Sequence, residues 1–88
     1  MFAKRTDANQ RQIVQALRKA GCAVQSLHAV GKGVPDLLCA RAGRLMLIEV
    51  KLPGEKPNAM QKAWHTAWAG HVYTVSTVEQ ALAAVGLN

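Results

Sequence analysis

The fold is decided by residues 33–51, which read GVPDLLCARAGRLMLIEVK. Residues 34–40 are apolar apart from a proline and an aspartate, and residues 45–50 are apolar apart from one glutamate. The short polar segment between these two runs contains Gly43. Two apolar runs joined by a few residues with a glycine are typical of antiparallel strands, so the stretch predicts a β-hairpin.

Two acids and a lysine occupy defined positions in this hairpin. We expect Arg41 to pair with Arg44 across the turn, which makes the numbers of paired residues sum to 85. Asp36 then faces Glu49, with Cβ atoms roughly 4.5–5.5 Å apart. Lys51 shares the face of Glu49 because side chains alternate along a strand. A loop of two or four residues preserves this register, and a loop of odd length would spoil it.

Opposed carboxylates in an apolar setting are costly unless a cation holds them. Like charges directly opposite each other destabilise a hairpin, and burial favours the neutral form of one carboxyl. A divalent cation reverses this preference because both carboxylates become ligands. Oxygen ligands favour Mg²⁺ or Mn²⁺, whereas the cysteines and histidines show no zinc spacing. Asp36 and Glu49 therefore predict such a site, with Lys51 stabilising negative charge or orienting an attacking water.

Length and charge limit the classes of function. A chain of 88 residues predicts one small domain, residues 1–88. The net charge of +6 indicates an anionic partner such as nucleic acid or a membrane surface. No stretch approaches the roughly 18 apolar residues of a membrane span, and no signal peptide is evident. Cys22 and Cys39 are expected to be buried free thiols, and the protein is expected in the cytoplasm.

Periodicity outside the hairpin predicts the other elements. The order is helix, three strands, helix, strand, helix, which indicates an α/β fold. Both faces of the hairpin are apolar, so we expect a mixed sheet covered by helices on both faces. The last strand should run parallel to the strand before it because a helix connects them. The expected ranges are 8–20, 59–69 and 77–85 for the helices, and 22–28 and 72–75 for the strands outside the hairpin.

Capping boxes are expected at the start of each helix. In this motif, a polar cap residue and an acid or amide three residues later bind each other's backbone N–H groups. The expected pairs are Asp7 with Gln10, Asn58 with Gln61, and Ser76 with Glu79.

The combined pattern resembles the VRR-NUC domain family of the PD-(D/E)XK nuclease superfamily. The residues that carry the resemblance are GVPD at 33–36, IEVK at 48–51 and Gln61 on the next helix. The resemblance covers nearly the whole chain and is strongest to short, stand-alone members from phages and prophages. It implies a restriction-endonuclease-like core, a small mixed sheet flanked by helices in the order αβββαβα.

The resemblance also implies roles for individual residues. Asp36, Glu49 and the backbone carbonyl of Val50 would be ligands of Mg²⁺ or Mn²⁺. Lys51 would be the catalytic lysine, and Gln61 would be the helix residue beside the site.

The first helix departs from the family pattern. The family usually adds a carboxylate there, and the matching position in this chain is Gln10. An amide at this position leaves Gln10 as at most an indirect, water-mediated ligand. Asp7, one turn earlier, is expected to serve as a helix cap.

The function implied by the resemblance is metal-dependent endonucleolytic hydrolysis of DNA. Nothing in the sequence resembles a recognition helix or a base-reading arm, so we do not expect readout of DNA sequence. The resemblance also implies a homodimer with two sites placed to cut both strands, which makes branched DNA, such as four-way junctions or flaps, the expected substrate. The basic residues expected to contact DNA are Lys32, Arg44, Lys56 and Lys62.

Two other classes of function stay open. A non-catalytic nucleic-acid-binding module would keep the fold and would bind with strong salt dependence and no metal requirement. A small dimerisation protein would use Trp64 and Trp68, which lie one helical turn apart. The capping-box position of Gln61 also explains that residue without catalysis, and His65 is expected at the surface.

Overall fold

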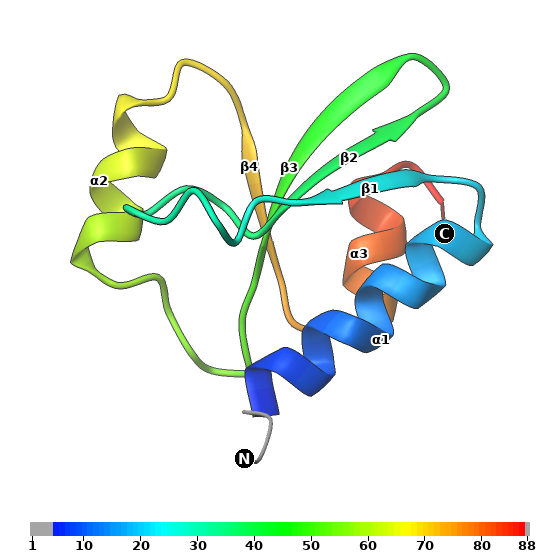
Figure 1. The fold of residues 1–88 in the computed structure, drawn as a ribbon, viewed down its shortest axis with the longest axis horizontal. Helices are drawn as coiled ribbons and strands as arrows, with labels where there is room; N and C mark the ends of the chain where they lie inside the picture. The colour runs from blue at the N-terminus through cyan, green and yellow to red at the C-terminus, as the bar shows by residue number, and fades with distance from the viewer. Residues whose placement is uncertain (1–4, 88) are drawn as a thin grey trace.

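A computed structural model describes the backbone of residues 5–87 and the side chains of residues 8–87. The elements follow the predicted order (Figure 1), which confirms the α/β class and the restriction-endonuclease-like arrangement. They are α1 (Arg5–Lys19), β1 (Ala23–Ser26), β2 (Leu37–Arg41), β3 (Arg44–Val50), α2 (Ala59–Ala67), β4 (Val72–Val75) and α3 (Val78–Ala84).

The sheet has the strand order β1-β2-β3-β4. β2 is antiparallel to β1 and β3, and β4 is parallel to β3, as the crossover through α2 predicts. Arg41 pairs with Arg44, so the predicted register of the hairpin is confirmed. The turn consists of Ala42 and Gly43, with φ angles of 52° and 78°. Two positive φ values are the requirement of the tight primed turns that suit a twisted hairpin.

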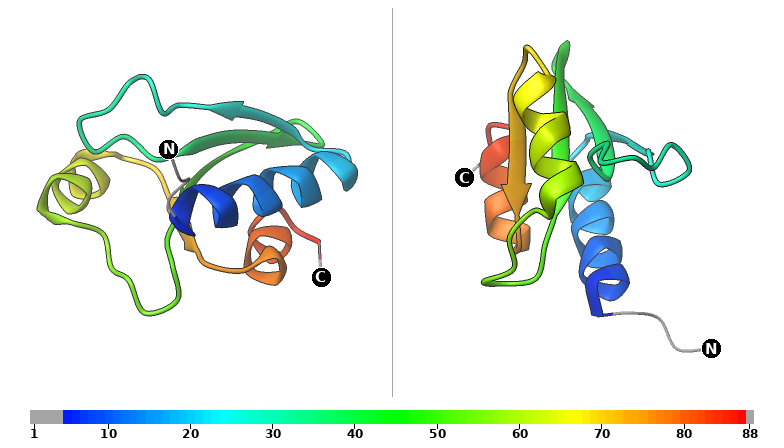
Figure 2. Two further views of the ribbon diagram at one scale, coloured as in Figure 1. Left: turned by 60° about the horizontal axis from the view of Figure 1, so that its bottom comes forward. Right: turned by 90° about the vertical axis from the view of Figure 1, so that its left-hand side faces the viewer.

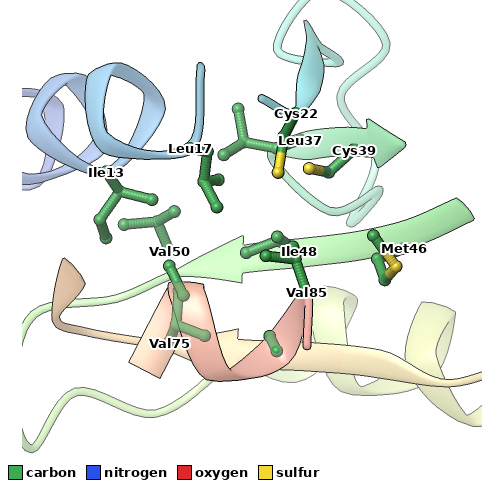
Figure 3. Close-up of a cluster of buried hydrophobic side chains, with 12 residues drawn as sticks. Ile13, Leu17, Cys22, Leu37, Cys39, Met46, Ile48, Val50, Val75 and Val85 are labelled. Atoms are coloured by element: carbon green, nitrogen blue, oxygen red, sulfur yellow. The ribbon is translucent and has the colours of Figure 1, made fainter. Parts of the chain in front are cut away.

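One face of the sheet carries the hydrophobic core. α1 and α3 lie on this face (Figure 2, left view) and contact each other as well as the strands. Figure 3 shows Ile13 and Leu17 of α1 above the strand residues Ile48 and Val50. The side chains of Ile13, Leu17 and Ile48 are fully buried. Burial of this apolar stripe fixes α1 against the sheet, including the carboxyl end of β3, where Val50 is buried.

The opposite face of the sheet is only partly covered, so helices flank the sheet as predicted but leave part of this face open. α2 has nine residues and no buried residue, and it stands at one end of the sheet (Figure 1). Leu45 on this face is 74% exposed. A short helix tied by loops at its two ends does not extend over the middle of the hairpin.

Two of the three predicted capping boxes are in the wrong place. The backbone of Asp7 is already helical, so Asp7 is not the cap of α1; no glycine or proline in residues 5–7 stops the helix there. α3 is capped by Thr77, whose hydroxyl accepts from the Gln80 N–H at 3.0 Å, so the predicted Ser76 and Glu79 pair is displaced by one residue.

The capping box of α2 is confirmed. The Asn58 side chain accepts from the Gln61 backbone N–H, and the Gln61 side chain accepts from the Asn58 backbone N–H, both at 2.9 Å.

The first strand of the hairpin begins later than predicted, at Leu37, because Pro35 has no N–H to donate to the sheet. Asp36 therefore lies in the bend immediately before β2.

Both cysteines are free and buried, as predicted. Figure 3 shows their sulfur atoms next to each other in the core. Burial, and secondarily the neighbouring Cys22, raises the pKa of the Cys39 thiol to about 11. A thiol that stays protonated is a poor nucleophile, so Cys39 serves packing.

In the described part of the chain, no helix is long and apolar enough to cross a membrane.

Candidate active site

Three segments meet at the carboxyl end of β3. Glu49 and Val50 end this strand, and Lys51 follows directly. Asp36 precedes β2, the antiparallel neighbour of β3, and Gln61 approaches from α2. The structure thus brings together four side chains that the sequence places on three separate segments.

Asp36 is fixed through both its backbone and its side chain. Its carbonyl oxygen accepts from the Leu27 N–H at 2.8 Å, and its Oδ2 accepts from the Val50 N–H at 2.7 Å. The second bond is short, as expected for a charge-assisted hydrogen bond. It ties the Asp36 carboxylate to the backbone between Glu49 and Lys51.

Glu49 is a buried acid, with 1% of its surface exposed. Its Oε2 accepts from the Gln61 side-chain amide at 3.1 Å and lies 3.9 Å from Lys51 Nζ. Burial, followed by the hydrogen bond and the negative charge of Asp36, raises the pKa of Glu49 to about 8. The positive charge of Lys51 lowers this pKa but does not offset the other causes. Without a cation, the pair of acids therefore retains a proton near neutral pH.

Gln61 has two functions at once. Its side-chain oxygen closes the capping box of α2, and its side-chain nitrogen donates to Glu49. The capping explanation and the site explanation are thus compatible, since they use different atoms of one side chain. Gln61 fixes the start of α2 relative to the end of β3.

The loop before Asp36 packs directly against the start of α2. Gly33 has a φ of +83°, and a Cβ atom on this residue would lie 2.5 Å from the Met60 backbone carbonyl oxygen. Only glycine combines this φ with so close an approach of two backbones. Gly33 therefore holds together the loop that carries Asp36 and the helix that carries Gln61.

Gly33→Ala is expected to destabilise the protein by more than about 1 kcal/mol beyond the cost of Gly31→Ala. Gly31 also has a positive φ, +67°, but has no neighbouring atom within 4 Å of an added Cβ. The control variant Gly31→Ala therefore has the backbone strain of a positive φ but no steric clash between its Cβ atom and a neighbouring backbone. Urea unfolding of the two variants measures the difference, and equal losses of stability would show that the contact with Met60 is unimportant.

The first helix reaches the site through a residue that the sequence analysis missed. Asn9 Nδ2 donates to the backbone carbonyls of Lys51 at 3.2 Å and Ser76 at 3.1 Å. Asn9 precedes the buried Ile13 by one turn and so continues the core-facing stripe of α1, which was the available signal. Gln10, the next residue, is half-buried, and its indirect role toward a metal stays a prediction.

His65 is the second residue that the sequence analysis missed. The sequence predicted a surface position, but the His65 side chain is only 19% exposed. Its Nε2 lies 3.8 Å from Glu49 Oε1. His65 follows Gln61 by four residues, so the two side chains share one face of α2. That spacing was the signal available in the sequence.

The basic residues proposed for DNA contact fall into two groups. Lys32, Lys56 and Lys62 are exposed on the loop before Asp36, the loop after Lys51, and α2. Arg44 is exposed at the hairpin turn, five residues and roughly 17 Å along β3 from Glu49. The structure therefore separates Arg44 from the site.

A polar hollow opens beside the acids. It has a volume of about 190 Å³, and its walls come from the loop before β2 and the start of α2. Asp36 and Gln61 line it, so a ligand in this hollow would contact the Asp36 carboxylate and the Gln61 side chain. The other lining residues are Leu27, His28, Gly31, Gly33, Val34, Asn58 and Met60.

The donor set fits a hard divalent cation. Among the side chains of residues 8–87, no three of His, Cys, Asp and Glu gather as a metal site, so the chain offers an ion at most two such ligands. Mg²⁺ needs no more, because it binds one or two carboxylates and completes its shell with water and phosphate oxygens. Buried Glu49 and half-buried Asp36, which share a retained proton, are a pair that such an ion would neutralise.

Comparison with known proteins identifies the family of the chain. The profile of the VRR-NUC domain matches residues 1–81. The chain belongs to the VRR-NUC family. A phage protein named "Putative nuclease p44", from Acyrthosiphon pisum secondary endosymbiont phage 1, is 36% identical over 63 residues, which are 69% of this chain and 68% of the relative. A solved structure of a VRR_NUC domain superimposes with a TM-score of 0.75 and 25% identity, covering 90% of this chain and 91% of that one. The predicted family is thus confirmed, and this VRR-NUC chain carries a nuclease domain.

Proposed function

We propose that this VRR-NUC domain is a Mg²⁺- or Mn²⁺-dependent endodeoxyribonuclease. The observation that carries the proposal is the pair of acids, Asp36 and buried Glu49, beside Lys51. Asp36, Glu49 and the Val50 carbonyl are the proposed ligands. When bound, the ion supplies Lewis-acid stabilisation of the phosphate and makes water nucleophilic at neutral pH.

The residues of the chain have distinct tasks in this proposal. Lys51 places its ammonium group next to Glu49, where it stabilises the negative charge that develops on the phosphate. Gln61 and the Val50 N–H orient the two carboxylates. The exposed Lys32, together with the other nearby lysines, holds the DNA backbone by contacts that carry no sequence information.

The proposed substrate is DNA recognised by its shape. The polar hollow beside Asp36 is bounded by loops and by the short helix α2, and no helix of the described chain projects as a groove reader. This arrangement favours branched DNA, such as four-way junctions or flaps. We place the activity in the cytoplasm of a bacterium or phage-infected cell, where two free thiols suit the reducing conditions.

Asp36→Ala is expected to abolish Mn²⁺-dependent nicking while the protein still binds DNA. The substitution removes a ligand and leaves the exposed lysines in place. The assay compares wild type and variant on linear, flapped and four-way-junction DNA, with binding measured by gel shift. A DNA-binding wild type that cuts none of these substrates would favour the alternative, a non-catalytic nucleic-acid-binding module.

We also propose that the protein is a homodimer formed through the partly covered face of the sheet. An apolar groove of about 410 Å³ lies there between the hairpin and α2, lined among others by Leu38, Leu47 and Trp64. Trp64 and Trp68 stack with their ring centroids 4.8 Å apart, and Trp68 remains 47% exposed. A second copy is the proposed occupant because a chain of this size gains much of its apolar burial by self-association.

Leu45→Glu is expected to convert the dimer into a monomer. Leu45 is the most exposed large apolar side chain of the described residues and belongs to this groove. Val30→Glu is the matched control, since Val30 is 58% exposed but lies in the loop between β1 and β2. Sedimentation velocity measures the outcome. A wild-type protein that sediments as a monomer at high micromolar concentration would contradict the dimer.

A further inference from the structure

With both acids ionised, two buried polar atoms of the site lack hydrogen-bond partners in the described structure. They are Glu49 Oε1 and His65 Nε2, and they face each other at 3.8 Å. Buried polar groups are nearly always paired, because leaving one unpaired forfeits its hydration without replacement. Two such atoms facing each other satisfy one another if they approach by less than about 1 Å.

We propose that His65 is a positioning residue that holds the Glu49 carboxylate from the side opposite to Gln61. Gln61 binds Oε2 of Glu49, and His65 faces Oε1. The two side chains project from α2 one turn apart, so a single helix face holds both oxygens of one acid. The inference rests on the proposed function in taking Glu49 as a metal ligand.

The orientation of the His65 ring supports this role. Trp64 meets it edge to face, with centroids 6.4 Å apart and planes at 82°. The imidazole is therefore held on one side by the indole and on the other by the acid. The small remaining movement is available because α2 has no buried residue and is fixed mainly at its first turn, by Gly33 and the capping box.

The geometry decides which nitrogen of His65 should carry the proton. Nε2 is the nitrogen that faces Glu49 Oε1, at 3.8 Å. A neutral imidazole has a single N–H, and an ionised carboxylate can only accept. We therefore assign the proton of His65 to Nε2, the nitrogen that faces Glu49.

Holding both oxygens fixes the plane of the carboxylate and leaves lone pairs for a cation. Each carboxylate oxygen can accept more than one interaction, so hydrogen bonds from α2 do not block ligation. Partners that orient a ligand in this way typically change metal affinity 10–100-fold when they are removed. His65 would then contribute to metal affinity without touching the substrate.

The first test is Mn²⁺ binding by titration calorimetry. We expect His65→Leu to weaken Mn²⁺ affinity about tenfold or more, and His65→Gln to restore most of it because the glutamine amide supplies a donor. Thr66→Leu is the matched control, since Thr66 is the exposed next residue of α2. Circular dichroism verifies that each variant is folded. A folded His65→Leu protein that binds Mn²⁺ as tightly as wild type would overturn the proposal.

The second test needs no metal and separates this proposal from the proposed function. Long-range ¹⁵N correlation spectra of the metal-free protein at alkaline pH report which nitrogen of His65 carries the proton. We expect protonated Nε2. If wild type binds no Mn²⁺, the metal dependence of the proposed function is rejected. The tautomer of His65 then tests the pairing of His65 with Glu49 by itself. A proton on Nδ1 would overturn the role of His65.

Discussion

Glu49→Gln is expected to abolish DNA cleavage and, in the absence of metal, to make the protein more stable than wild type at alkaline pH. Glutamine keeps the size of the side chain and an oxygen that accepts from Gln61, but it cannot ionise. It therefore removes the charge that would bind Mg²⁺ or Mn²⁺ and also removes the cost of burying that charge. Loss of activity with a gain of stability is typical of a residue retained for function.

The pH dependence of this effect follows from the raised pKa of Glu49. The native protein binds a proton at Glu49 up to about pH 8, whereas the unfolded chain releases it near the ordinary value of 4.5. The native state then holds more protons than the unfolded state between these pH values, so the stability that Glu49 contributes falls as pH rises. It is fully present below 4.5 and is lost as pH rises through 8.

The advantage of Glu49→Gln over wild type should therefore grow from about pH 5 to pH 8 and level off above it. One pKa unit corresponds to about 1.4 kcal/mol, and we expect a final difference larger than that. Urea unfolding in EDTA at several pH values measures it. Addition of Mn²⁺ should stabilise wild type and leave the variant unchanged. A variant less stable than wild type at pH 9 in EDTA would contradict the buried charge.

Lys51→Met is expected to reduce the cleavage rate about 100- to 1,000-fold with little loss of metal binding. The Lys51 side chain is 11% exposed, with Nζ 3.9 Å from Glu49 Oε2. Methionine fills the same space without the ammonium group, so the substitution removes charge stabilisation of the transition state. Removal of a neighbouring cation should also leave Mn²⁺ affinity equal or tighter.

Single-turnover cleavage and Mn²⁺ titration measure the two effects separately. The matched control is Lys19→Met, an exposed lysine at the end of α1. A Lys51→Met protein that cuts at the wild-type rate would show that Lys51 is only an ion-pair partner of Glu49. Loss of both cleavage and Mn²⁺ affinity would instead indicate a structural role.

The hairpin could be predicted because local rules decide it. A two-residue turn at Ala42 and Gly43 and the alternation of apolar residues leave one register, and that register determines which face Glu49 and Lys51 share. Apolar periodicity, helix caps and glycine stops then predicted the remaining elements. The positions of Glu49 and Lys51 thus follow from spacing within a single supersecondary unit.

The rest of the site depends on how separate elements dock, which spacing does not encode. The orientation of α2 is set by the contact of Gly33 with Met60 and by the bond of Gln61 to Glu49. His65 enters the site only through that docking. The incomplete cover of the second sheet face was missed for the same reason, because apolar residues on both faces predict coverage and do not say how much of it a helix supplies.

The central claim is that Asp36 and Glu49 hold a divalent cation that makes this VRR-NUC domain a DNA nuclease. Its most direct test is the initial rate of nicking of a four-way junction by wild type in Mn²⁺, in Mn²⁺ with excess EDTA, and by Glu49→Gln in Mn²⁺. We predict cleavage in the first reaction and none in the other two. Equal cleavage with EDTA, or by Glu49→Gln, would contradict the account.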